Sequence, residues 1–189
     1  MAWLFTKNAK ALLFALGAIL LFTVYTTTDI FRTKLQHKLV VYNIPRSTAI
    51  DIIQGNKSKA LMSAASAKDT LLQNFYLQPT RLLFRTVPNQ SNILSTNNYL
   101  LHIANKSILI IGKPLPAISL QQKLPADAVI ITGNPELYMS QVNALLSSPT
   151  IVFDSSNPTW KIERWKKDCN SLHLPFHSVA QRGAFVMDL

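Results

Sequence analysis

Few side chains in this sequence are of types that carry out chemistry. Its 189 residues include 4 histidines, 1 cysteine and 9 acidic residues. His173 and His177 are four positions apart, but Pro175 between them breaks the helix that would place both rings on one face. Ser155 follows an apolar run, yet its neighbours lack the glycines of a nucleophile elbow. From these residues we predict no catalytic, cofactor-binding or metal-binding site.

The most informative side chains lie on the helix predicted at residues 158–172. Ile162, Trp165, Cys169 and Leu172 recur at spacings of three and four, which predicts a buried stripe. The opposite face carries the basic residues, and the tail loop adds another; as a set, these candidate nucleic-acid contacts are Lys161, Arg164, Lys167 and Arg182. A solvated face without a partner fits the same pattern.

The residues before this helix are predicted to cap it. Side-chain oxygens in the block Asp154-Ser155-Ser156-Asn157 can accept hydrogen bonds from the first free N–H groups, and Pro158 suits the first helical position. Two short strands, 176–179 and 184–187, are expected to form a closing hairpin around Gly183. The residues assigned to cap or core are Asp154, Ser155, Asn157, Trp160, Trp165 and Gly183.

The composition is that of a folded, strongly basic chain. Hydrophobic residues make up 48% of it, which is enough for a core, and 19 Lys+Arg against 9 Asp+Glu give a formal net charge of +10. Such a charge attracts polyanions, either nucleic acid or anionic lipid headgroups. The single cysteine excludes an intramolecular disulfide and a multi-cysteine metal site.

The amino-terminal segment is predicted to anchor the chain in a membrane. Residues 11–28 carry no charge, and at 1.5 Å per residue they just cross a hydrocarbon core of about 30 Å. A cleavable signal peptide is the alternative, because Lys7 and Lys10 make a basic flank, but no small-residue cleavage site follows. We therefore expect a basic flank at 1–10, a transmembrane helix at 11–30, a linker at 31–37 and a soluble domain at 38–189.

The soluble domain is predicted to be α/β, rich in strands, with mixed sheets and outer helices. Its first half is expected to contain a three-stranded meander, a helix, a further strand, a polar loop and a hairpin, at residues 39–62, 64–78, 81–86, 88–97 and 98–111. In the second half, strands and helices alternate at 128–131, 135–146, 151–153 and 158–172. This alternation favours parallel strands covered by helices.

Several ordered blocks resemble the carboxyl-terminal region of ComEC-type DNA-uptake (competence) proteins, in the form common in Bacteroidetes. They include VVYNIPRSTAIDIIQGN at 40–56, ILIIGKP at 108–114 and ADAVIITGNP at 126–135. The resemblance implies a last transmembrane helix followed by a metallo-β-lactamase-like domain at the bacterial inner membrane. It implies as partners the membrane, DNA and the remaining transmembrane part of the channel. Since only one span precedes the domain here, a fragment or a separately encoded half of the full protein is expected.

The sequence departs from that family where metal ligands would stand. Residues 62–69 lack the histidine and aspartate cluster, Lys113 replaces an expected aspartate, and no histidine follows residue 131 closely. A lysine ammonium there would repel a divalent ion. We therefore expect a degenerate domain, a pseudoenzyme without cofactor. The alternatives are a nuclease that uses Asp51, Asp69 and Asp154 as unusual ligands, or a purely structural membrane-associated domain.

Overall fold

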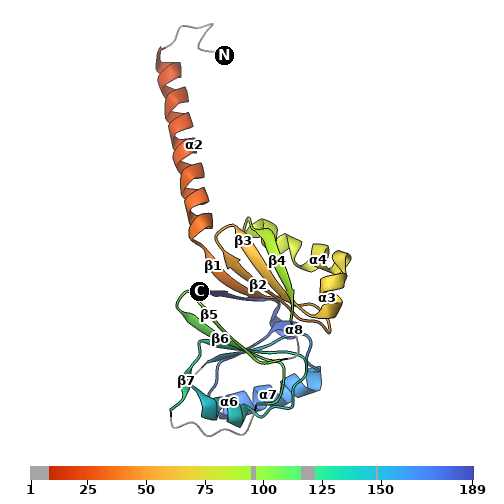
Figure 1. Cartoon of the computed structure of the whole chain (residues 1–189). Helices are drawn as coiled ribbons and strands as arrows, with labels where there is room; N and C mark the ends of the chain where they lie inside the picture. Colours follow the sequence, from red (N-terminus) through yellow and green to blue (C-terminus); the bar gives the residue numbers. More distant parts are fainter. Residues whose placement is uncertain (1–8, 95–96, 116–121, 148) are drawn as a thin grey trace.

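Two five-stranded sheets lie face to face, and helices cover their outer surfaces (Figure 1). The computed structural model describes residues 9–94, 97–115, 122–147 and 149–189. Apolar side chains of both sheets, such as Leu39 and Ile50 from one and Ile108 and Ile130 from the other, form the core between them. Further clusters fill the space between each sheet and its helices. The predicted mixed α/β fold with outer helices is confirmed.

The first sheet has the strand order β12-β1-β2-β3-β4. Its strands are β1 (His37–Val41), β2 (Ala49–Gln54), β3 (Lys57–Met62), β4 (Val87–Ile93) and β12 (Phe185–Asp188). The predicted meander is confirmed, since β2 pairs antiparallel with β1 and β3. Gly55 takes the left-handed φ of 59° in the tight β2–β3 turn. The predicted loop at 88–97 is wrong: most of it is β4, an edge strand that tolerates polar residues and Pro88 because one side needs no partner.

The second sheet has the order β11-β10-β8-β6-β5. Its strands are β5 (Tyr99–Ile103), β6 (Lys106–Ile111), β8 (Ala128–Ile131), β10 (Thr150–Phe153) and β11 (Phe176–Ser178). The hairpin of β5 and β6 is confirmed, and β6, β8, β10 and β11 run parallel. The carboxyl ends of these four strands therefore meet at one edge of the sheet. A two-stranded pair, β7 (Leu124–Pro125) and β9 (Leu146–Ser147), lies apart from it.

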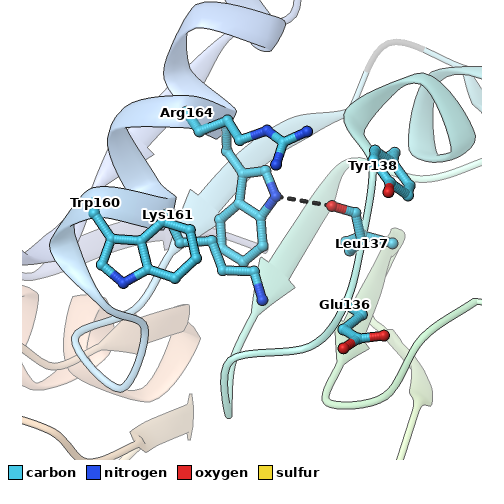
Figure 2. Close-up of a pocket in the computed structure, with 7 residues that line it drawn as sticks. Glu136, Leu137, Tyr138, Trp160, Lys161 and Arg164 are labelled. Atoms are coloured by element: carbon cyan, nitrogen blue, oxygen red, sulfur yellow. Dashed lines mark hydrogen bonds between the residues drawn. The ribbon is translucent and has the colours of Figure 1, made fainter.

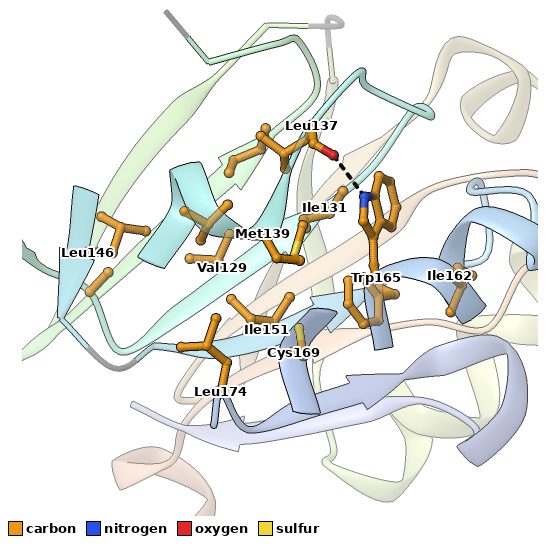
Figure 3. Close-up of a cluster of buried hydrophobic side chains, with 14 residues drawn as sticks. Val129, Ile131, Leu137, Met139, Leu146, Ile151, Ile162, Trp165, Cys169 and Leu174 are labelled. Carbon is orange, nitrogen blue, oxygen red and sulfur yellow. Dashed lines mark hydrogen bonds between the residues drawn. The ribbon is translucent and has the colours of Figure 1, made fainter. Parts of the chain in front are cut away.

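Helices α6 (Met139–Leu145) and α7 (Thr159–Ser171) cover the outer face of the second sheet. The buried stripe predicted for α7 is confirmed, because Ile162, Trp165 and Cys169 enter the cluster shown in Figure 3 and Leu172 packs against it. The Trp165 indole stacks on Phe153 with ring centroids 5.6 Å apart. This packing fixes α7 rigidly on the sheet.

Three short helices cover the first sheet: α3 (Ala64–Lys68), α4 (Thr70–Tyr76) and α5 (Gln78–Leu83). The single helix predicted at 64–78 is thus broken at Asp69, and the strand predicted at 81–86 is wrong. Arg81 lies on α5, and its guanidinium reaches inward to the buried Asp51. Leu71 and Phe75 on α4 are 81% and 76% exposed, and Leu77 fills the core.

The carboxyl-terminal tail joins the two sheets. The predicted closing hairpin is wrong, since β11 pairs with β10 in the second sheet whereas β12 pairs with β1 in the first. The short helix α8 (Val179–Arg182) and Gly183, which has φ 83°, carry the chain across. The tail therefore couples the two halves of the domain.

Helix α2 (Ala9–Leu35) projects from the end of the domain opposite α6 and α7 (Figure 1). Within the described residues it is the one helix long and apolar enough to cross a membrane, over Lys10–Leu35. The Gln36 side chain donates hydrogen bonds to Gly55 O and Phe84 O, and Arg85 pairs with Asp29. These contacts tie the end of α2 to the domain. The basic flank predicted at 1–10 lies mostly outside the described residues.

Candidate functional site: a hydroxyl-rich pocket at the strand ends

A pocket of about 250 Å³ lies where the carboxyl ends of β6, β8 and β10 meet the β1–β2 loop. Ligands of open α/β sheets bind at such strand ends. The pocket is rich in hydroxyl groups and contains one cationic side chain; its lining residues are Arg46, Ser47, Thr48, Ser63, Leu94, Gly112, Thr132, Gly133, Asn134 and Ser156. Loops from both sheets therefore build it.

Asp154, directly beneath the pocket, is fully buried and saturated with hydrogen bonds. Its Oδ2 accepts from the Thr48 hydroxyl at 2.5 Å, and its Oδ1 accepts from the Ser156 hydroxyl at 2.5 Å and Asn157 Nδ2 at 2.8 Å. Burial raises the pKa of Asp154 to about 6, although hydrogen bonds from Ser156, Thr48 and Thr132 oppose the rise. The carboxylate thus ties the two sheets together.

The block predicted to cap α7 builds this site instead. The structure assigns the N-cap to Pro158, with no side-chain cap hydrogen bond, so the capping prediction is wrong. The Ser156 hydroxyl accepts from Gly133 N at 2.7 Å, Asn157 Oδ1 accepts from Asn134 N at 3.1 Å, and Ser155 donates to Asn43 Oδ1 at 2.6 Å. Asp154 and its neighbours thereby fix the loop after β8 in place.

A second group of hydroxyls forms the opposite wall. Ser47 hydrogen bonds with Ser63 at 2.7 Å and also with the buried Ser66. Arg46, which directly precedes Ser47, has the left-handed φ of 56° and an exposed side chain. This wall offers neutral hydroxyls and one guanidinium, groups that suit an anion better than a divalent cation.

The three aspartates considered as unusual metal ligands lie in separate environments. Asp51 accepts two hydrogen bonds from Arg81, at 2.8 and 3.1 Å, and one from the Tyr42 hydroxyl at 3.0 Å. Asp69 caps α4 through Leu72 N, and Asp154 has the partners described above. Among the described residues, no three His, Cys, Asp or Glu side chains gather into a possible metal site.

The candidate nucleic-acid contacts lie on two helices, three of them on α7 and one on α8. Arg164 and Lys167 are exposed on α7, while Lys161 donates to Asn134 Oδ1 at 2.8 Å. Arg182 belongs to α8, where its guanidinium stacks on the Phe176 ring at 5.8 Å. The Lys161 side chain thus extends from α7 to Asn134 at the rim of the pocket.

The two tryptophans of α7 have opposite environments. Trp165 is buried, as predicted, and its Nε1 donates to Leu137 O at 2.9 Å. Trp160, which was assigned to the cap or core, is 67% exposed. That assignment is wrong because residue 160 lies on the helix face turned away from the sheet.

Residues 39–189 match the family described as the ComEC C-terminal domain. The chain belongs to the ComEC family. This membership confirms the resemblance to the carboxyl-terminal region of ComEC proteins that was inferred from the sequence. No curated protein and no solved structure matched the chain.

Sequence reasoning missed most of the pocket in this ComEC domain. It assigned no role to Arg46, Thr48 or Thr132. A usable signal existed, since Thr132 and Asp154 each follow a buried strand directly, and parallel strands end at the same edge of a sheet. The contribution of the β1–β2 loop could not be read in this way because it comes from the other sheet.

Proposed function

We propose that this chain is a membrane-anchored, non-catalytic module of a ComEC-like DNA-uptake channel at the bacterial inner membrane. Its membership in the ComEC family supports a role in competence and DNA uptake. In this proposal the domain is a degenerate metallo-β-lactamase-like domain of the Bacteroidetes type. Its partners are the membrane, the transmembrane part of the channel, and DNA.

The environment of Asp154 is the observation that supports a domain without catalytic activity. A metal ligand or general base needs a lone pair directed at the reacting group. Both carboxylate oxygens of Asp154 instead accept hydrogen bonds from Thr48, Ser156 and Asn157 inside the protein. The Asp154 side chain, directly after β10, is therefore engaged by partners inside the protein.

The way in which α2 is attached to the domain supports the proposed membrane anchoring. The apolar segment ends near Asp29, whose carboxylate pairs with Arg85, and Gln36 binds two backbone carbonyls of the domain. With residues 11–28 in the hydrocarbon core, this pair lies at headgroup depth, where charged side chains are tolerated. The first sheet would then lie next to the bilayer surface.

A metal and nuclease assay tests the catalytic question. The full chain in lipid nanodiscs is incubated with Zn²⁺ or Mn²⁺, separated from free metal and assayed for bound metal and for cleavage of labelled single- and double-stranded DNA. We expect neither stoichiometric metal nor cleavage. Cleavage that is lost on substituting Asp51, Asp69 or Asp154 by alanine in a folded variant would establish the nuclease alternative instead.

A genetic assay tests the role in DNA uptake. In the bacterium that encodes the chain, deletion of the gene is expected to abolish uptake of labelled DNA, and the wild-type gene to restore it. Undiminished uptake in the deletion strain would contradict the proposal. If the strain loses uptake but the purified chain does not bind DNA, or binds it without dependence on salt, the domain is purely structural, because phosphate contacts weaken steeply with salt.

A further inference from the structure

A second cavity, of about 360 Å³, lies between α7 and the segment that leads into α6. Figure 2 shows Trp160, Lys161 and Arg164 on the α7 side and Glu136, Leu137 and Tyr138 on the other. We call this cavity the Trp160 groove. Its volume is that of a site for a small organic group such as a nucleobase.

The walls of the Trp160 groove are held firmly. Trp165, which also lines the groove, is buried, stacks on Phe153 and donates from Nε1 to Leu137 O at 2.9 Å. Figure 2 shows a hydrogen bond to Leu137 as a dashed line. This bond joins α7 directly to the opposite wall. A ligand would therefore meet a preformed groove and would not have to order it.

Two aromatic side chains at the groove are open to solvent. Trp160 is 67% exposed and Tyr138 is 58% exposed. Trp160 stacks on no other ring within the described part of the chain. Exposed rings of this kind offer faces on which the bases of single-stranded nucleic acids stack, at about 1–3 kcal/mol per base.

The charges around the rings favour an anionic ligand. The exposed Arg164 guanidinium lies 5.8 Å from the Tyr138 ring centroid, and Lys167 is exposed further along α7. Glu136 is the one carboxylate in the lining, against Lys161 and Arg164. A guanidinium over an aromatic ring can stack with a base and also contact phosphate.

The groove adjoins the hydroxyl-rich pocket. Lys161 lines the groove and binds Asn134, which lines the pocket. An extended chain in the groove could therefore continue toward Arg46. Helix α7, which forms one wall of the groove, is at the opposite end of the domain from α2 (Figure 1), so lipid headgroups around α2 do not reach the groove.

We propose that the Trp160 groove binds single-stranded nucleic acid, with a base stacked on Trp160 or Tyr138 and phosphate contacted by Arg164. Only a single strand fits, because a duplex keeps its base faces stacked internally. This inference rests on the proposed DNA-handling function and adds the place on the domain where DNA binds.

The affinity of the full chain for a fluorescein-labelled oligothymidylate of 12 nucleotides tests the proposal. Binding is measured by anisotropy in zwitterionic nanodiscs at several salt concentrations. Trp160→Ala is expected to weaken binding by roughly 5- to 150-fold, and Trp160→Phe to retain most of the affinity. Phe75→Ala, which removes an equally exposed ring from α4, is the matched control and should change nothing.

Two further probes separate this site from the broader function. An abasic oligomer of the same length should bind the wild type more weakly, and a blunt duplex should bind weakly and without sensitivity to Trp160→Ala. Equal affinity for abasic and thymidylate oligomers, or an unchanged affinity in Trp160→Ala, would contradict DNA binding in the Trp160 groove. Neither result would contradict the proposed role in DNA uptake. If Trp160→Ala spares DNA affinity yet disrupts co-purification with the channel's transmembrane part, the groove is a protein-docking site and the proposal is wrong. Loss of uptake on gene deletion tests the broader function separately.

Discussion

The Thr48 hydroxyl donates a 2.5 Å hydrogen bond to the Asp154 carboxylate, joining residues 106 positions apart. Thr48 comes from the β1–β2 loop of the first sheet and Asp154 from the end of β10 in the second. The same Thr48 hydroxyl also hydrogen bonds with Thr132, which follows β8. The open edge between the sheets is therefore closed by hydroxyls around one buried carboxylate.

Asp154→Asn is expected to change how stability depends on pH. Burial raises the pKa of Asp154 from 3.8 to about 6, so its contribution to stability is complete below pH 3.8 and is lost as pH rises through about 6. Relative to Asp154→Asn, the wild type should lose about 3 kcal/mol over this range. Urea unfolding followed by tryptophan fluorescence at pH 4 to 7 measures the difference.

Asp188→Asn serves as the control for this pH series. Its carboxylate is exposed in the pair with Lys38, so the substitution should change the free energy of unfolding little. A constant difference between Asp154→Asn and the wild type at every pH would mean that Asp154 titrates normally, which contradicts the burial argument.

Arg81→Met is expected to destabilise the domain by about 3–5 kcal/mol, because it leaves the fully buried Asp51 carboxylate without its cation. Adding Asp51→Asn to this variant should recover part of the loss. Lys38→Met, which breaks a pair whose Asp188 carboxylate is exposed, should cost no more than about 1 kcal/mol. Midpoints of chemical unfolding rank the variants, and equal losses for Arg81→Met and Lys38→Met would contradict the structural role of Arg81.

Trp165→Ala and Trp160→Ala should differ sharply in stability. Trp165 is buried and loses its stack on Phe153 and its hydrogen bond to Leu137, so about 3–5 kcal/mol is expected. The exposed Trp160 should change stability by no more than about 0.5 kcal/mol. Thermal unfolding by circular dichroism compares them. A large loss of stability in Trp160→Ala would mean that Trp160 packs in the core, which contradicts its exposure in the structure.

Local patterns in the sequence were enough for much of the fold. The meander β1–β3, the β5–β6 hairpin and the alternating units of the second sheet follow from turn residues and apolar runs, and all are present. The wrong predictions concern segments that contact residues far away in the sequence. Arg81 lies on α5 and pairs with Asp51, thirty residues away, and β4 extends the first sheet along the free edge of β3.

The site was harder to predict than the fold for the same reason. Asp154-Ser155-Ser156-Asn157 has the composition of a helix cap, and only the arrival of Thr48 and Gly133 from elsewhere turns it into the floor of a pocket. Trp160 has the same residue type as Trp165, and the helical spacing of the apolar stripe excludes it from the core. In this case the periodicity was a better guide than the residue type.

The most direct measurement of the central claim follows binding and integrity of DNA together. The full chain in nanodiscs, with Zn²⁺ or Mn²⁺ present, is mixed with labelled single-stranded DNA, and anisotropy is recorded before the DNA is run on a denaturing gel. We predict binding that weakens steeply with salt and DNA that remains intact. Shortened DNA together with stoichiometric bound metal would contradict the account of this domain as a non-catalytic module.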